Sequence, residues 1–174
     1  MHSFENNIII FIGPDNSGKT TIAKKLAKEL DVSYFKNSLE QYSFRKNDFS
    51  ALLEIGAPLT LSLIHQSKLK NNAIILDRFT PCEYAYSKTY NRTTNEKLIW
   101  EIDKDLYFLN GYIIYCYKDI YENFSDPLIK SSELGTIKYY YEEYLKQTVI
   151  PHLKLNTTDQ NLENQINQIK QFLL

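Results

Sequence analysis

Hydrophobic and polar positions divide the chain into two kinds of segment, and the first kind is a short run of β-branched and aromatic residues. Such continuous apolar runs are typical of parallel strands that are buried on both faces. Runs of this kind predict strands over residues 7–12, 73–76 and 112–117, and the mixed segments 32–36 and 152–156 are interpreted as two further strands.

The second kind of segment has apolar residues at helical spacing with lysines and other polar residues between them, as from Ile22 to Leu30. This pattern predicts a helix over 18–30, and similar patterns predict helices over 51–56, 59–70, 81–90, 95–109, 136–150 and 162–173. A break is expected at Ala57-Pro58, because a residue before proline disfavours the helical conformation.

Strands that alternate with helices predict an α/β fold with a mostly parallel sheet covered on both faces. The 174 residues are enough for one domain with a proper core, so we expect a single domain over 1–174. Gly13, Asp77, Lys118 and Asn156 fall at predicted strand carboxyl ends, where ligands of such sheets bind. We therefore expect these four residues to share one rim.

Charge and composition narrow the function classes. The chain has 20 basic and 21 acidic residues, which removes the broad positive surface of a duplex-binding protein but leaves a local basic groove open. Cys82 and Cys116 are far apart, so neither a disulfide framework nor a zinc site is expected. No apolar run approaches 18 residues and the first residues lack signal-peptide order, so we expect a soluble, cytoplasmic protein with no membrane partner.

The sequence GPDNSGKT at residues 13–20 has the spacing of a phosphate-binding loop between a strand and a helix. Its glycines allow backbone N–H groups to point at phosphate oxygens, and the helix that follows directs its positive end at the anion. In such a loop Lys19 reaches the β and γ phosphates of a nucleotide, and the Thr20 hydroxyl binds Mg²⁺. The expected nucleotide-binding residues of the loop are Gly13, Asn16, Ser17, Gly18, Lys19, Thr20 and Thr21.

A second chemical element is LDRF at residues 76–79. Asp77 ends a predicted buried strand, where phosphate-loop enzymes hold Mg²⁺ or its waters. Arg78 can form a bidentate pair with an acceptor phosphate or with the phosphoryl group in transit. An alternative is that Asp77 and Arg78 merely form a turn that caps the next helix.

Two segments resemble the thymidylate kinase family and its relatives among deoxynucleoside and deoxynucleotide kinases. GPDNSGKTT is similar to the family pattern G-x-D-x-x-G-K-[ST]-T, and DRFTPCEYAY at 77–86 is similar to D-R-Y-x-x-S-x-x-A-[YF]. In the second segment Phe79 replaces Tyr and Cys82 replaces Ser. Tyr144-Leu145 looks like the Tyr-Leu pair that follows the family's lid, which here corresponds to about residues 119–136.

The resemblance implies a three-layer phosphate-loop fold with a five-stranded parallel sheet in the order 2-3-1-4-5. It also implies transfer of the γ-phosphoryl group of ATP, with Mg²⁺, to a pyrimidine deoxynucleoside monophosphate such as dTMP. Asp15 would contact the acceptor sugar and Arg78 its phosphate, and the segment at Asn156 and Thr157 would lie near the adenine. Further acceptor-site candidates implied by the resemblance are Phe35, Phe44, Arg45, His65, Gln66 and Tyr86.

The chain departs from the family at the arginine that stabilises charge on the transferring phosphoryl group. Asn16 stands where one branch of the family has that arginine, and no arginine follows Arg92 in the sequence. Lys130 is the basic residue of the expected lid. Three explanations follow: Lys130 substitutes for the arginine, Arg92 or a partner subunit supplies the charge, or turnover is slow.

Several functions therefore remain open from the sequence. The leading hypothesis is a nucleotide kinase that forms a homodimer, as the family does. One alternative is a deoxynucleoside kinase, or a kinase of a hydroxylated base within DNA of the type that some viruses and phages encode, which would act in a host cytoplasm. The near-neutral charge argues mildly against DNA. The other alternative is a nucleotide-binding protein with little turnover.

Overall fold

The computed structural model describes residues 6–37, 52–121, 129–159 and 161–174. Within these residues, the five strands are β1 (Ile8–Ile12), β2 (Ser33–Lys36), β3 (Ile74–Asp77), β4 (Gly111–Tyr117) and β5 (His152–Asn156). All of the pairings between them are parallel, and the strand order is β2-β3-β1-β4-β5. This confirms the fold class and the strand order that the resemblance implied.

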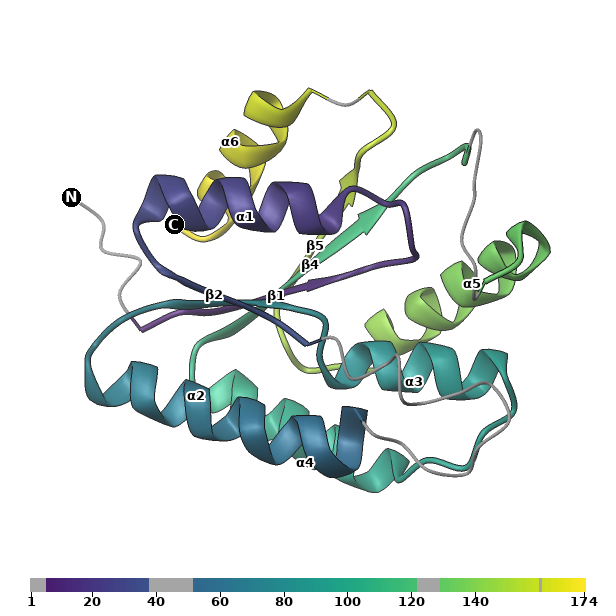
Figure 1. The fold of residues 1–174 in the computed structure, drawn as a ribbon, viewed down its shortest axis with the longest axis horizontal. Helices are drawn as coiled ribbons and strands as arrows, with labels where there is room; N and C mark the ends of the chain where they lie inside the picture. Colours follow the sequence, from purple (N-terminus) through teal and green to yellow (C-terminus); the bar gives the residue numbers. More distant parts are fainter. Residues whose placement is uncertain (1–5, 38–51, 122–128, 160) are drawn as a thin grey trace.

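Helices cover both faces of the sheet (Figure 1). The α-helices of the described residues are α1 (Lys19–Leu30), α2 (Ala57–Leu69), α3 (Thr80–Thr89), α4 (Glu96–Phe108), α5 (Leu134–Leu145) and α6 (Leu162–Phe172). Helices α1 and α6 lie on one face, and α2, α3, α4 and α5 lie on the other. The chain is therefore a three-layer αβα structure.

The central strand β1 shows why its sequence has no polar position. Ile8, Ile10 and Ile12 belong to the core beneath α2 to α5, whereas Ile9 and Phe11 belong to the core beneath α1 and α6. Every side chain of β1 is fully buried, because successive residues of a strand point to opposite faces and both faces are covered.

Two predicted helix boundaries differ from the structure. Residues 52–56 form a π-helical turn that runs directly into α2, with Pro58 in the first turn of that helix. Proline is tolerated there because the first N–H groups of a helix have no intrahelical partner, so Ala57-Pro58 is a helix start and not a break. Helix α5 begins at Leu134 and ends at Leu145, earlier than the predicted end at Ile150.

The carboxyl end of β1 lies against the backbone of β4. Gly13 follows β1 with φ of +140°, and a Cβ atom at this position would lie 2.0 Å from the carbonyl oxygen of Cys116. Only glycine fits this approach without displacing backbone, so Gly13 determines how the loop after β1 leaves the sheet.

Helices α4 and α5 are joined by a buried carboxylate. Tyr144 Oη and Thr148 Oγ1 both donate to Asp103 Oδ2, at 2.6 and 2.7 Å. The Tyr144 ring stacks on Trp100 at a centroid distance of 5.4 Å. Burial raises the pKa of Asp103 to about 6, although the two hydroxyl donors act in the opposite direction.

Replacing Gly13 with alanine is expected to destabilise the fold by about 3 kcal/mol or more, because the methyl group overlaps backbone and the φ is strained. Gly135 is the matched control, since it lies exposed in α5 with no neighbour within 4 Å of an added Cβ. Gly135→Ala should stabilise by about 0.5 to 1 kcal/mol. Urea unfolding of both variants measures the contrast, and equal effects would contradict the packing described.

The second prediction concerns pH. Between about pH 4, the ordinary pKa of an aspartic acid, and pH 6, folded Asp103 retains a proton that the unfolded chain has released. Stability should therefore fall as pH rises through this window, by an amount on the order of 2 kcal/mol for this group. Asp103→Asn should remove that part of the slope in urea unfolding at pH 4.5, 5.5 and 7, whereas Asp105→Asn, at an exposed position of the same helix, should not. Equal slopes in Asp103→Asn and the unsubstituted protein would contradict the assignment.

Candidate functional site

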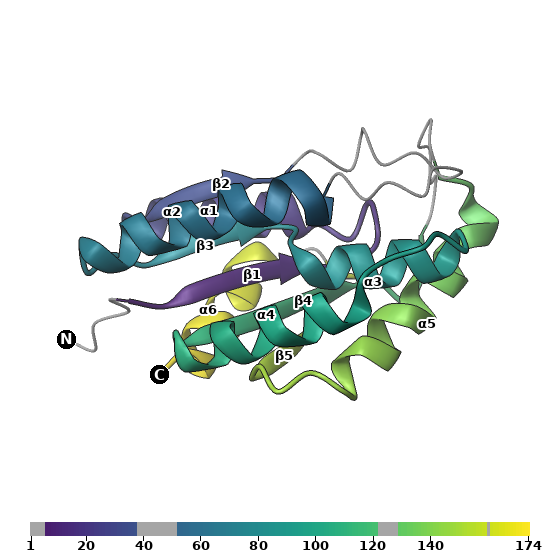
Figure 2. The ribbon, with the colours of Figure 1, turned by 90° about the horizontal axis from the view of Figure 1, so that it is seen from below.

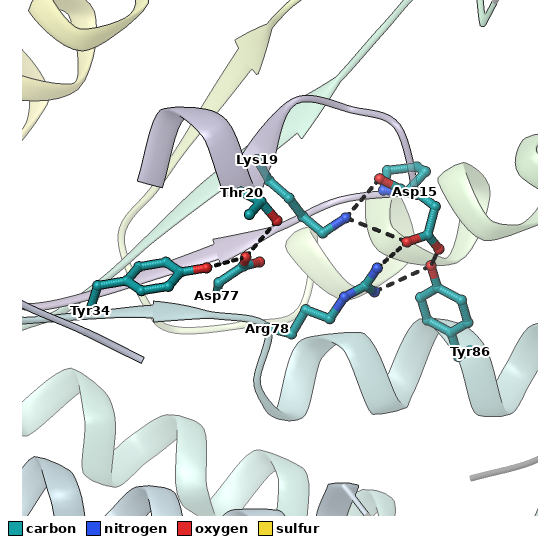
Figure 3. Close-up of polar contacts among 8 residues, drawn as sticks. Asp15, Lys19, Thr20, Tyr34, Asp77, Arg78 and Tyr86 are labelled. Atoms are coloured by element: carbon teal, nitrogen blue, oxygen red, sulfur yellow. Dashed lines mark hydrogen bonds and ion pairs between the residues drawn. The ribbon is translucent and has the colours of Figure 1, made fainter. Parts of the chain in front are cut away.

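The site lies at the carboxyl ends of the strands, where the loop of residues 13–18 joins β1 to α1 (Figure 3). Gly18 and Asn16 have positive φ angles of 78° and 61°, and Ser17 N–H donates to Pro14 O at 3.3 Å. Helix α1 begins at Lys19 with no side-chain cap on its first N–H groups. These groups and the positive end of the helix are therefore available to an anion.

The loop is anchored from the far side of the sheet by Thr157, the residue after β5. Thr157 Oγ1 lies 2.8 Å from the carbonyl oxygen of Ser17 and 3.0 Å from that of Tyr117, and its N–H donates to Tyr117 O at 2.8 Å. The Thr157 side chain is 3% exposed. Sequence reasoning placed it near the adenine of a nucleotide, whereas the structure shows a contact that holds the loop.

Its neighbour Asn156 has an exposed side chain that caps the local turn. Asn156 Nδ2 donates to Asp119 Oδ2 at 2.7 Å, and Asn156 Oδ1 accepts from Thr158 N–H at 3.0 Å. Hydrogen bonds thus join residues 117–119, at the end of β4, to residues 156–158, at the end of β5. The sequence predicts the adenine of a nucleotide near this segment.

Thr20 and Asp77 bring two oxygen-bearing side chains together beside the loop. Thr20 Oγ1 donates to Asp77 Oδ2 at 2.6 Å, and the Asp77 side chain has no solvent exposure. Asp77 Oδ1 is buried and has no hydrogen-bond partner within the described part of the chain. An oxygen-only pair with one unmatched carboxylate oxygen suits Mg²⁺, which commonly uses one or two protein carboxylates and keeps several waters. The residues therefore fit the expected metal.

A second cluster lies beside the first and joins Asp15, Lys19, Arg78 and Tyr86 (Figure 3). Arg78 Nη2 donates to Asp15 Oδ1, and Tyr86 Oη donates to Asp15 Oδ2 at 2.5 Å. Lys19 Nζ lies 3.8 Å from Asp15 Oδ1 and donates to Pro14 O at 3.0 Å. Lysine and arginine thus converge on one small carboxylate.

The charges of this cluster oppose one another. Burial raises the pKa of Asp15, but the positive charges of Arg78 and Lys19 outweigh that effect and hold the pKa below its usual range. Burial and the charge of Arg78 lower the pKa of Lys19. A second anion placed here would therefore stabilise the charged form of Lys19.

Arg78 owes its direction to its backbone. It has a φ of +74°, uncommon for a residue with a side chain, and its N–H donates to Phe11 O at 3.0 Å. This conformation ends β3 and turns the chain into α3, which carries Tyr86. Residues 77–80 thus form the turn between β3 and α3, and this turn connects the Thr20–Asp77 pair with the cluster around Asp15.

Three other expected acceptor residues lie on β2 and α2. Phe35 is half-buried in β2 against the core beneath α2 to α5. His65 and Gln66 are exposed in the second half of α2, which runs away from the loop toward the amino ends of the strands (Figure 2). The structure does not bring these two side chains to the described cluster. Phe44 and Arg45 lie outside the described residues.

The cations considered as replacements for the absent arginine are in different environments. Arg92 Nη2 forms an ion pair with Glu83 Oε2 at 3.4 Å, and both side chains are nearly fully buried. Lys130 is exposed, and its backbone N–H donates to Glu133 Oε2 at 2.8 Å. The Lys130 side chain is therefore open to solvent, whereas Arg92 has a buried ion-pair partner.

Sequence reasoning missed Tyr34, whose Oη donates to Asp77 Oδ2 at 2.9 Å. The two residues are 43 positions apart and share no motif. The strand order gives the signal that could have found it. Strand β2 pairs with β3, so the hydroxyl of a tyrosine on β2 can reach the carboxyl end of β3.

The described residues contain neither a membrane-spanning helix nor a cluster of metal-ligating side chains. Among the described residues, none of the helices has the length and apolar character needed to cross a membrane. The same part of the chain contains no group of three or more His, Cys, Asp or Glu side chains placed to hold a metal.

Solved structures of similar fold are numerous. The YorR protein of Bacillus subtilis, solved in complex with phosphorylated GDP, is 22% identical with a TM-score of 0.64, over 94% of this chain and 96% of that one. Thymidylate kinase from Ehrlichia chaffeensis is 15% identical with a TM-score of 0.68, over 97% and 98%. Deoxyadenosine kinase from M. mycoides, solved with dCMP and dCDP, is 20% identical with a TM-score of 0.57, over 95% and 97%.

These likenesses confirm the resemblance at the level of the fold. The comparison with curated proteins found no match. A family model described as an AAA domain matches residues 8–159, which include all five strands and both clusters of the site. The chain therefore belongs to the AAA domain family.

Proposed function

We propose that this protein transfers the γ-phosphoryl group of ATP to a nucleotide. The observation that carries the proposal is the placement of Lys19 between two clusters on one rim. On one side of Lys19, Thr20 and Asp77 form the proposed cation site. On the other side lie Arg78 and Tyr86, together with Asp15, whose carboxylate contacts both Lys19 and Arg78. A kinase needs this arrangement, because donor and acceptor phosphates must meet in line.

On the donor side, the loop of residues 13–18 and the first turn of α1 would hold the β and γ phosphates. Thr20 has a single hydroxyl proton and donates it to Asp77, which leaves its lone pairs for Mg²⁺. When bound, Mg²⁺ would neutralise charge on the phosphates and on the transferring group. Lys19 would exchange its contact with Pro14 O for the phosphate oxygens, since a carbonyl is a weaker partner than a dianion.

On the acceptor side, Arg78 would bind the phosphate of a nucleoside monophosphate. Its guanidinium is buried and contacts Asp15 through one nitrogen. A phosphate that replaced this carboxylate could form the bidentate contact for which a guanidinium is suited. Asp15 would then accept from a hydroxyl of the acceptor sugar, with Tyr86 holding its other oxygen. We propose a pyrimidine deoxynucleoside monophosphate such as dTMP as the first acceptor to test.

Two features support that acceptor over the alternatives. Thymidylate kinase from Ehrlichia chaffeensis shares the fold over nearly the full length of both chains, and the sequence from Asp77 to Tyr86 follows the thymidylate kinase pattern. The similar structures also include a deoxyadenosine kinase and a protein bound to phosphorylated GDP. Nucleosides, purine monophosphates and oligonucleotides therefore belong in the same assay.

Slow turnover is the specific rival to a kinase, because the chain has no arginine at position 16 or after Arg92. Arg92 is held by Glu83 in a buried pair, so we propose that Lys130 supplies the missing charge. The homodimer, the single domain over 1–174 and the lid at about 119–136 remain part of this proposal.

The third prediction tests the transfer itself. With Mg-ATP and each nucleoside, deoxynucleoside and monophosphate, the protein should form ADP in an acceptor-dependent way, fastest with dTMP or a related pyrimidine nucleotide. Lys19→Ala should lower the rate about 10²-fold or more, because it removes a buried cation at the transferring group. Lys28→Ala, at an exposed position of the same helix, is the control and should leave the rate within twofold. Tight ATP binding with no transfer to any acceptor would overturn the kinase proposal.

The fourth prediction concerns Lys130. Lys130→Ala should lower kcat about tenfold or more and change the KM values for ATP and acceptor little, because the charge matters most in the transition state. Lys130→Arg should retain or raise kcat, since a guanidinium can contact two phosphoryl oxygens. Lys97→Ala, at an exposed surface lysine of α4, serves as the control. An unchanged kcat in Lys130→Ala would exclude this lysine as the substitute.

A further inference from the structure

Tyr34 connects the edge strand β2 to the candidate cation site (Figure 3). Its Oη lies 2.9 Å from Asp77 Oδ2, the same oxygen that accepts from Thr20 Oγ1 at 2.6 Å. Tyr34 is half-buried, and nothing in the two motifs of the site includes it. The contact therefore adds a second donor to the carboxylate that is expected to serve the metal.

The direction of this hydrogen bond is fixed. A phenol has one proton to donate, whereas an ionised carboxylate only accepts, so Tyr34 Oη donates to Asp77 Oδ2. A donor on an ionised oxygen is stronger than one on a neutral group, so the contact is able to orient the carboxylate.

The surroundings of Tyr34 hold the hydroxyl in place. Strand β2 pairs with β3 so that Tyr34 lies opposite Ile75, and the N–H of Asn37 donates to the carbonyl of Asp77 at 3.0 Å. Lys24 Nζ lies 5.8 Å from the centre of the Tyr34 ring. The ring is therefore fixed by the strand pairing below it and by a cation at its face.

The consequence falls on the other carboxylate oxygen. Two hydroxyl donors occupy Asp77 Oδ2, while Oδ1 is buried and has no partner within the described residues. Two hydrogen bonds to Oδ2 limit rotation of the carboxylate, so Oδ1 is held in one orientation. Outer hydrogen bonds of this kind are known to tune metal affinity by orienting the ligand.

We propose that Tyr34 is a positioning residue that acts through Asp77 to set the affinity of the site for the divalent cation that accompanies the nucleotide. This inference rests on the proposed function, since it takes the site to bind a metal with ATP. By this route Tyr34 acts on the carboxylate of Asp77 and not on the phosphates or the acceptor. Its effect should therefore appear in the metal dependence of nucleotide binding, and the metal-free affinity should be unaffected.

The test compares the full chain with Tyr34→Phe and Tyr112→Phe. Tyr34→Phe removes the donor and keeps the ring beside Lys24. Tyr112 is the matched control, because it is a half-buried tyrosine on the same face of the sheet and packs edge-on against Phe172. Binding of a fluorescent ATP analogue is measured in EDTA and across a titration with MgCl₂.

In Tyr34→Phe, the Mg²⁺ concentration that gives half of the binding enhancement should rise about 10-fold or more, the loss expected for one hydrogen bond to a charged group beside a metal. The affinity in EDTA should stay within twofold, and Tyr112→Phe should match the unsubstituted chain. An unshifted Mg²⁺ curve in Tyr34→Phe would overturn the inference and leave the kinase proposal intact. An equal loss in EDTA and in Mg²⁺ would also overturn it, because the tyrosine would then support the nucleotide pocket directly.

A double-mutant cycle gives the second readout. If Tyr34 acts through Asp77, Tyr34→Phe should have no further effect on the Mg²⁺ curve when Asp77 is already asparagine. Additive effects of the two substitutions would contradict that route. If the unsubstituted chain shows ATP binding with no dependence on Mg²⁺, the metal role of Asp77 in the proposed function fails, and the inference about Tyr34 fails with it.

Discussion

Two buried cations, Lys19 and Arg78, lie close together at the carboxyl end of the sheet, and the rest of the site depends on how their charge is compensated. Each is about 5% exposed, so water solvates neither charge well and each needs a charged or hydrogen-bonding partner. Asp15 lies between them and contacts both, and Tyr86 donates to its second oxygen. Lys19 and Arg78 thus share the carboxylate of Asp15, while Asp77 also acts on the charge of Lys19. Phosphate oxygens are stronger partners for buried cations than neutral groups are, so either cation is suited to bind one.

The fold brings this cluster together from three places. Lys19 begins α1, Asp15 lies in the loop after β1, and Arg78 follows β3 in a left-handed backbone conformation. Parallel pairing of β1 with β3 brings these strand ends to the same edge of the sheet. Thr157 then closes the arrangement from β5 by holding the carbonyl oxygens of Ser17 and Tyr117. A sheet with fully buried central strands is needed because the loop has few contacts of its own to keep it in shape.

The sequence could predict the features that repeat over short distances. Apolar runs identified β1, β3 and β4, whereas mixed segments suggested β2 and β5. The spacing of Gly13, Gly18 and Lys19 identified the loop. The strand order came from the family resemblance, since periodicity does not report which strands are neighbours. Residues at strand ends could be expected to share a rim because parallel strands all point the same way.

The features that the sequence could not show depend on tertiary distance. The contact of Tyr34 with Asp77 joins two strands that are adjacent in space only because β2 lies at the edge beside β3. His65 and Gln66 were suggested by the family resemblance, and both are exposed in the second half of α2. The helix start at Ala57 was hidden because proline is compatible both with a break and with a first turn. Thr157 illustrates the same limit, since a hydroxyl near a nucleotide loop can serve the ligand or the backbone.

The central claim is that one rim holds the donor and acceptor phosphates on either side of Lys19. The most direct measurement is a crystal structure with Mg²⁺ and a bisubstrate analogue in which adenosine and thymidine are joined by a chain of phosphates. The account predicts phosphate oxygens within hydrogen-bond distance of Lys19 Nζ and Arg78, and the thymidine sugar beside Asp15. An analogue bound away from residues 13–20, or one that leaves Arg78 paired only with Asp15 and without a phosphate contact, would contradict it.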